Sequence, residues 1–201
     1  MNKYPKYIEV NSTKYEINTD FRVALKCDEV VRDDSICEYE KVLAIIYLLL
    51  GDKGLGDEEN HSKMIKPLMK YLRCGKDLED TNQDSEPSMD FKQDTGYIKA
   101  SFMSDYGIEL DNAKMHWWAF FDLLNGLTEN SVLNRVRMIR EEPLSGKKGK
   151  ELEKWQKMKK QVELKREKTE KEKELDKYWE KILKKGSDSN GWMASDKNEN
   201  Q

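Results

Sequence analysis

Histidine and cysteine are the residues of this chain whose chemistry would first suggest a metal or redox site. The two histidines, His61 and His116, lie in different predicted elements, and neither has a second ligand at metal-binding spacing. Cys27, Cys37 and Cys74 form no C-x-x-C pair, so the usual zinc and redox motifs are absent. We interpret all three thiols as small core or boundary residues, and both histidines as structural.

Phosphate-binding and nucleophile motifs are also missing. Gly51, Gly54 and Gly56 form a glycine-rich loop, but the Lys-Ser/Thr that completes a P-loop does not follow them. No dinucleotide-binding or nucleophile-elbow motif occurs. The carboxylates are plentiful, yet they fall mostly in predicted helix caps and loops, which favours a solvated acidic surface. We therefore expect no enzymatic activity and no metal or cofactor.

The charge is distributed unevenly along the 201 residues. Residues 1–146 carry a net charge of −8, residues 147–185 a net charge of +7, and residues 186–201 a net charge of −2. Apolar and charged residues each make up 37% of the chain, which indicates a packed core in one part and a solvated segment in another. We predict a core domain over 1–146, a charged helical arm over 147–185 and a disordered tail over 186–201.

The N-terminal residues have the pattern of a β-hairpin. Two runs, 7–10 and 14–17, are rich in aromatic and β-branched residues, and Asn11-Ser12-Thr13 between them supplies turn chemistry. Tyr15 and Ile17 fall on one face of the second run. Because an isolated two-stranded ribbon is marginal in water, one face must pack on helices.

Six amphipathic segments follow the hairpin, and caps mark their ends. Asp20, Asp90, Asp111 and Thr128 are predicted N-caps, and Ser35 begins a capping-box pattern. The predicted helices cover about 21–32, 35–51, 57–74, 90–107, 111–126 and 128–140. The sequence thus predicts a mainly α fold, with the hairpin packed on a bundle of about six helices and a long charged C-terminal helix after them.

The fifth predicted helix is the most aromatic part of the chain. It carries Trp117, Trp118, Phe120 and Phe121 within five residues. Burying each large side chain contributes about 1.5–3 kcal/mol, so we expect this helix to dominate the core.

The charged arm, predicted to be helical over 149–185, holds two apolar groups. The first consists of Leu152, Trp155, Met158, Val162 and Leu164, and Trp179 belongs to the second, while residues 165–174 contain no apolar side chain. A coiled coil would need an unbroken seam, so a solvated helix is favoured. We predict Trp155 and Trp179, with Met158 and Val162, as partner-binding residues. An alternative is that Trp155 packs back onto the core domain.

Membrane insertion and export are not indicated. The longest apolar run, 42–50, has nine residues, whereas a membrane span needs about 20. The N-terminus lacks the apolar stretch of a signal peptide, so a cytoplasmic setting is expected. The arm does not favour nucleic-acid binding, because glutamates are interleaved with its lysines and cancel much of its positive field.

Four ordered motifs are similar to those of a known family. They are YEINTDFR (15–22), YLRCGK (71–76), YIKASF with YGIEL (97–102 and 106–110), and HWWAF followed by LL and GL (116–127). In this order and spacing they resemble the bacteriophage "gene product fifteen" family of tailed phages and prophages. The likeness covers about residues 5–165.

The resemblance implies a function but carries over no catalytic residues. Members resemble tail-assembly proteins encoded between the major tail protein and the tape measure protein. It therefore implies a tail assembly chaperone that acts in the host cytoplasm, binds the tape measure protein or the major tail protein, and need not remain in the virion. Self-association into a homo-oligomer is a further expectation. The alternatives are a structural component of the tail or baseplate, and a nucleic-acid-binding accessory protein.

Overall fold

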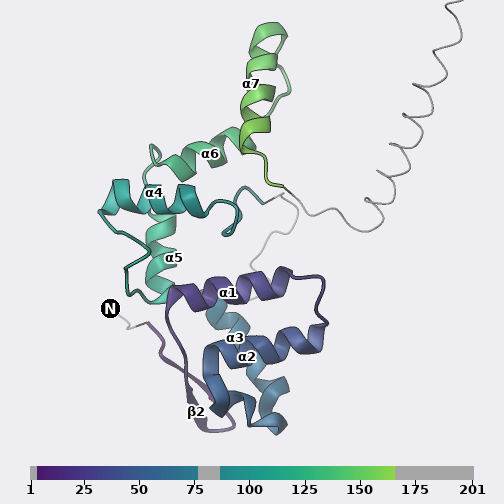
Figure 1. Ribbon diagram of the computed structural model, residues 1–201, viewed down its shortest axis with the longest axis vertical. Helices are drawn as coiled ribbons and strands as arrows, with labels where there is room; N and C mark the ends of the chain where they lie inside the picture. The colour runs from purple at the N-terminus through teal and green to yellow at the C-terminus, as the bar shows by residue number, and fades with distance from the viewer. Residues whose placement is uncertain (1–3, 77–86, 166–201) are drawn as a thin grey trace, which may run out of the picture. The chain divides into compact units, whose positions relative to one another are not determined.

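The described residues, 4–76 and 87–165, form seven α-helices, one short 3-10 helix and a β-hairpin in the computed structural model (Figure 1). The elements are β1 (Tyr7–Val10), β2 (Thr13–Glu16), α1 (Phe21–Arg32), α2 (Glu38–Leu55), η1 (Glu58–Asn60), α3 (His61–Leu72), α4 (Thr95–Tyr106), α5 (Trp117–Asn125), α6 (Val132–Glu141) and α7 (Gly149–Val162). The predicted fold class, mainly α with an N-terminal hairpin, is confirmed.

One compact unit, Met1–Leu164, contains all of these elements. It includes α7, the first part of the predicted charged arm. The arm was expected to be one helix from Gly149 to Lys185, but α7 ends at Val162, where Glu163 has an extended backbone with ψ of 134°. Residues 166–185 of the arm and the predicted tail, 186–201, lie outside the described residues.

The hairpin turns tightly between β1 and β2. The strands pair antiparallel, with Tyr7 opposite Glu16 and Val10 opposite Thr13. Asn11 and Ser12 have φ of 48° and 65°, the two positive values that a type I′ turn requires. This turn gives the ribbon the right-handed twist of its strands.

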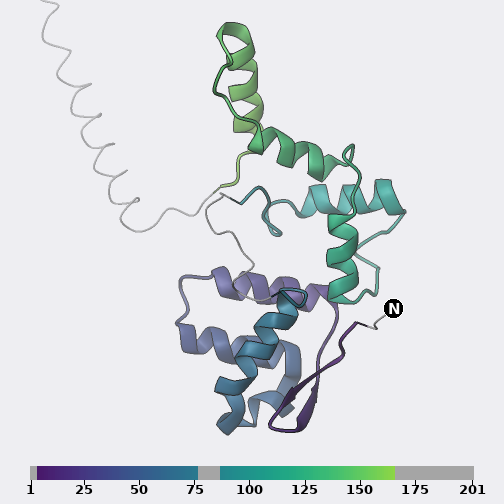
Figure 2. The ribbon, with the colours of Figure 1, turned by 180° about the vertical axis from the view of Figure 1, so that it is seen from behind.

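One face of the hairpin is buried, as the alternation of its residues predicted. Ile8, Val10 and Tyr15 are buried, and the two strands contact α3 and α2 (Figure 2). The Tyr15 hydroxyl donates a hydrogen bond to Asp57, just before η1. The helices therefore supply the apolar surface that a two-stranded ribbon lacks by itself.

The start of α1 agrees with the sequence prediction, whereas the start of α2 does not. Asp20 is the N-cap of α1, and its carboxylate accepts the Arg22 amide hydrogen at 2.9 Å. The capping box predicted at Ser35 is wrong by two residues, because Ser35 donates its amide and hydroxyl hydrogens to Asp33. Cys37 is the N-cap instead, and its amide donates to Glu40 at 3.0 Å.

Gly51 interrupts α2 without ending it. Its φ of 63° and ψ of −158° are non-helical values that only glycine adopts readily, and the helix resumes up to Leu55. The sequence predicted the interruption at the correct residue but took it for the end of the helix.

Helices α4, α5 and α6 begin later than predicted. Their N-caps are Asp94, His116 and Ser131, not Asp90, Asp111 and Thr128. The earlier residues are engaged by other groups, since Asp90 accepts two amide hydrogens in a preceding turn and the Thr128 hydroxyl donates to Asp105. Each of these helices is preceded by more than one residue that could serve as its N-cap, and the contacts formed in the fold decide which one does.

Phe120 on α5 is the centre of the aromatic core. Its ring stacks on Phe21 of α1 at 4.7 Å, on Phe102 of α4 at 5.1 Å and on Trp117 at 5.7 Å between centroids. Only 1% of Phe120 is exposed. These contacts join three helices, as the aromatic density of this segment predicted.

The two tryptophans of α5 also complete the end of α3. Trp117 Nε1 donates to the Leu72 carbonyl and Trp118 Nε1 to the Tyr71 carbonyl, each at 2.9 Å. The last carbonyls of a helix have no partner within it, so these indole hydrogens satisfy groups that would otherwise need water. Gly75 lies beside the Trp118 ring, where a Cβ would come within 3.1 Å of Cη2.

A buried ion pair holds α4 against α6. Arg140 binds both carboxylate oxygens of Asp94 at 2.7 Å, and the two side chains are 11% and 1% exposed. Asp94 also accepts the Asp90 amide hydrogen, and Arg140 donates to the Ser88 carbonyl. The segment before α4 and the end of α6 are thus joined through two charged side chains.

Breaking this pair should be costly. Arg140→Ala leaves the Asp94 carboxylate buried and unpaired, so we expect the free energy of unfolding to fall by about 3–5 kcal/mol. Arg135→Ala, at an exposed position of α6, is the control and should change it by less than about 0.5 kcal/mol. Urea titration measures both. The double variant Asp94→Leu, Arg140→Met leaves no buried charge at these two positions, so its free energy of unfolding should fall far less than that of Arg140→Ala. An equal fall would contradict the proposed cost of an unpaired buried carboxylate.

Asp105 should make stability depend on acid pH. Hydrogen bonds from the Thr128 amide and from Ser104 lower the pKa of this carboxyl. The stability that Asp105 contributes to the fold is therefore fully present above the pKa of about 3.9 that the carboxyl has in the unfolded chain. It is lost as the pH falls through the lower pKa of the folded chain. We expect wild type and Asp105→Asn to differ in stability at neutral pH and to converge in strong acid, as measured by urea unfolding. A constant difference at every pH would contradict this.

Candidate functional site

Both histidine side chains form hydrogen bonds with backbone atoms. His61 Nε2 lies 2.9 Å from the Leu55 carbonyl oxygen. His116 Nδ1 accepts the Trp118 amide hydrogen at the start of α5, which leaves Nε2 to donate to the Pro5 carbonyl. Both ring nitrogens of His116 are thus engaged in positioning α5 and the N-terminal segment.

The cysteines occupy three different environments. Burial raises the pKa of the Cys27 and Cys74 thiols to about 12, which keeps them protonated at neutral pH. Cys37 was expected in the core or at its boundary, but it is exposed, because it caps the solvated start of α2. Within 4–76 and 87–165, no three His, Cys, Asp or Glu side chains come close enough to hold a metal ion.

The described helices also differ from membrane spans in length and polarity. None within 4–76 and 87–165 combines the length and apolar character needed to cross a bilayer.

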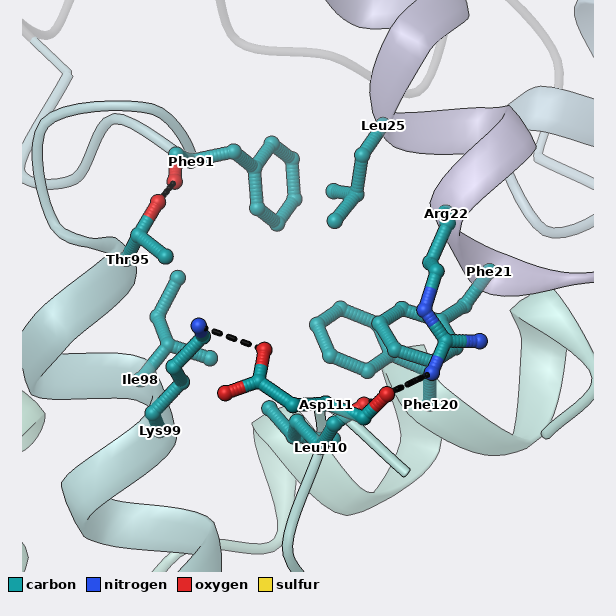
Figure 3. A pocket seen from close by; sticks show the side chains of 10 residues that line it. All are labelled: Phe21, Arg22, Leu25, Phe91, Thr95, Ile98, Lys99, Leu110, Asp111 and Phe120. Carbon is teal, nitrogen blue, oxygen red and sulfur yellow. Dashed lines mark hydrogen bonds and ion pairs between the residues drawn. The ribbon is translucent and has the colours of Figure 1, made fainter. Parts of the chain in front are cut away.

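A pocket of about 170 Å³ opens between α1, α4 and α5 (Figure 3). Its apolar lining comes from six side chains on these helices and on the segments before α4 and α5: Phe21, Leu25, Phe91, Ile98, Leu110 and Phe120. The remaining lining residues are polar: Arg22, Thr95, Lys99 and Asp111. A cavity of about 150 Å³ holds a benzene molecule, so this pocket has room for one large apolar side chain.

The charged rim of the pocket is held together internally. Arg22 donates to the carbonyls of Leu110 and Asp111 at 2.9 and 2.8 Å, and Lys99 pairs with the Asp111 carboxylate at 2.6 Å. These bonds fix the segment before α5 over α1 and α4. The arrangement suits binding of an apolar group beneath a polar rim better than acid–base chemistry, because the charged groups already neutralise one another.

The predicted partner-binding residues of the arm lie on one side of α7. Trp155, Met158 and Val162 are half-buried, as is Leu152, and no residue of α7 is fully buried. The Lys147 ammonium lies 4.8 Å from the centre of the Trp155 ring. Their role in binding stays a prediction, and Trp179 lies outside the described residues.

The C-terminal end of α7 is fastened to α6. Arg140 Nε donates to the Val162 carbonyl and Lys159 Nζ donates to the Arg140 carbonyl, both at 2.6 Å. The segment between α6 and α7 runs beside α7 in both views (Figures 1 and 2). The apolar side of α7 is therefore covered only in part.

Sequence reasoning missed the pocket. Its lining residues are spread over three helices and two connecting segments, and each one fits an ordinary core or surface pattern. No spacing in the sequence brings Leu25, Phe91 and Lys99 together, so the site had no local signal.

Comparison with known proteins places the chain among phage proteins. The family model described as "Bacteriophage Gp15 protein" matches residues 1–164. This range ends where the compact unit ends. No curated protein and no solved structure matches the chain.

Removing the Trp155 ring should loosen α7 locally. Because α7 buries no residue completely and packs on α6, we expect Trp155→Ala to speed amide hydrogen exchange throughout α7 while exchange in α1–α3 stays unchanged. Lys154→Ala, on the exposed side of α7, is the control and should leave exchange as in wild type. Faster exchange in α1–α3 would instead identify Trp155 as part of the main core.

Proposed function

The chain belongs to the bacteriophage Gp15 protein family, and from this premise we propose that it is a tail assembly chaperone. In this role it binds the tape measure protein during assembly of a long phage tail, and hands it over as the major tail protein polymerises around it. The match of the family model over 1–164 is the observation that carries the proposal, because it covers the whole compact unit.

The pocket between α1, α4 and α5 supports a role in holding apolar segments. Its lining is mostly aromatic and aliphatic, and its volume of about 170 Å³ accommodates one large side chain. A long helical tape measure protein would expose such side chains at regular intervals until the tail subunits enclose it. Each one buried in the pocket would gain about 1.5–3 kcal/mol and would be withheld from aggregation.

The partly covered side of α7 is a second surface suited to the same task. Trp155, Met158 and Val162 present a half-buried apolar strip beside exposed lysines. Methionine adapts well to partner helices, and aromatic side chains such as tryptophan are common anchors in protein interfaces.

A binding assay with a pocket variant tests the proposal. Leu25 lies half-buried in the lining, so Leu25→Trp should fill the pocket and reduce capture of the co-expressed tape measure protein about tenfold or more. Leu25→Met, which nearly conserves volume, is the control and should bind as wild type does. Circular dichroism and the melting temperature verify that both variants fold.

Two results would contradict the proposal. One is a wild-type chain that captures no tape measure protein, together with normal tails after deletion of its gene. The other is the chain at stoichiometric amounts in mass spectra of purified particles, which would favour a structural role in the tail or baseplate.

A further inference from the structure

The side of α7 opposite Trp155 carries an unpaired cationic face. Lys150, Lys154 and Lys157 recur at intervals of four and three, which places them on one side of the helix. All three are exposed, and none forms an ion pair with the described part of the chain. Residues 147–162 hold seven lysines and two glutamates, a net charge of +5.

The connection between α1 and α2 has the opposite character. Residues 28–40 hold six acidic residues and one arginine, a net charge of −5. Glu29 and Asp34 are exposed and pair with no cation among the described residues. Hydrogen bonds from Ser35 and Cys37 lower the pKa of Asp33 and Glu40, so these carboxylates stay charged in mild acid.

Apolar side chains lie among these acidic residues. Tyr39 is 66% exposed and Val31 is 40% exposed, so the turn offers contact area as well as charge. A charged surface that includes an exposed tyrosine has the composition of a protein-binding site.

We propose that the lysine face of α7 in one copy of the chain docks on the α1–α2 turn of a second copy. The unpaired side chains of the two surfaces have opposite charges, and a lysine face is best matched by a surface of exposed carboxylates. The bonds of Arg140 and Lys159 fasten α7 to its own α6, which leaves the lysine face open to another molecule.

The contact joins two different surfaces, so it is head-to-tail. An open array of such contacts leaves one free α7 at one end and one free turn at the other, whereas a ring leaves neither surface free, so the contact builds rings or open helical arrays. This inference does not depend on the identity of the tape measure protein, and its test uses the full chain alone.

Complementary charge reversal tests the contact. Variant A is Lys150→Glu, Lys154→Glu, Lys157→Glu, and variant B is Glu29→Lys, Asp34→Lys. In sedimentation velocity, wild type should associate as its concentration rises, and less so at about 1 M salt than at about 0.1 M, since the Debye length falls from about 10 to about 3 Å. A and B alone should each associate about 100-fold more weakly, because the reversed side chains of one surface then face unreversed side chains of like charge on the other.

Mixing A with B should restore association, because the reversed side chains on α7 of A then face the reversed side chains on the turn of B, and these two sets have opposite charges. The matched control reverses three exposed lysines elsewhere and so changes the net charge by the same amount as A: Lys6→Glu, Lys63→Glu, Lys66→Glu. It should associate as wild type does. Circular dichroism verifies that every variant folds.

Three outcomes would overturn the proposal. A wild-type chain that stays monomeric at all concentrations has no such contact. Association that survives in A and in B uses other surfaces. Loss in A and B without recovery on mixing means that α7 docks within its own chain or on a different partner, such as a nucleic acid.

Discussion

The buried ion pair between Asp94 and Arg140 is the constraint on which the second half of the molecule depends. Both charged groups are largely buried: the Asp94 carboxylate accepts a hydrogen bond from the segment before α4, and the Arg140 guanidinium of α6 donates to that segment and to the end of α7. Taking two charges out of water is expensive, and the cost is offset only when both are fully hydrogen-bonded. The pair therefore requires one arrangement of these elements and penalises others.

The aromatic residues of α5 provide the corresponding constraint in the first half. Phe120 joins α1 and α4 by ring stacking, while Trp117 and Trp118 bind the last carbonyls of α3. Together they position α1 against α4, and the pocket opens where these helices separate. The core thus shapes the surface on which the proposed binding depends.

The distribution of polar groups suits a protein that works by contact. His116 and Asp94 cap helices or pair inside the fold, and Arg22 closes the rim of the pocket. The side chains left for other molecules are apolar or carry like charges side by side, as on α7 and the α1–α2 turn. Such surfaces recognise partners through area and charge, which suits the proposed role in tail assembly.

Local chemistry determined several features from the sequence alone. The hairpin, the N-cap at Asp20, the helix end at Gly107 and the aromatic helix were all predictable, because each depends on residues within a few positions of one another. The family motifs were recognisable for the same reason, as ordered short stretches.

Tertiary structure decided the rest. The starts of α2, α4, α5 and α6 depend on which of several capping residues is already engaged elsewhere, as Thr128 is by Asp105. The ion pair joins residues 46 positions apart, and the pocket draws on three helices and two connecting segments. Side chains so far apart along the chain meet only when the whole unit packs, so their spacing in the sequence cannot predict these contacts.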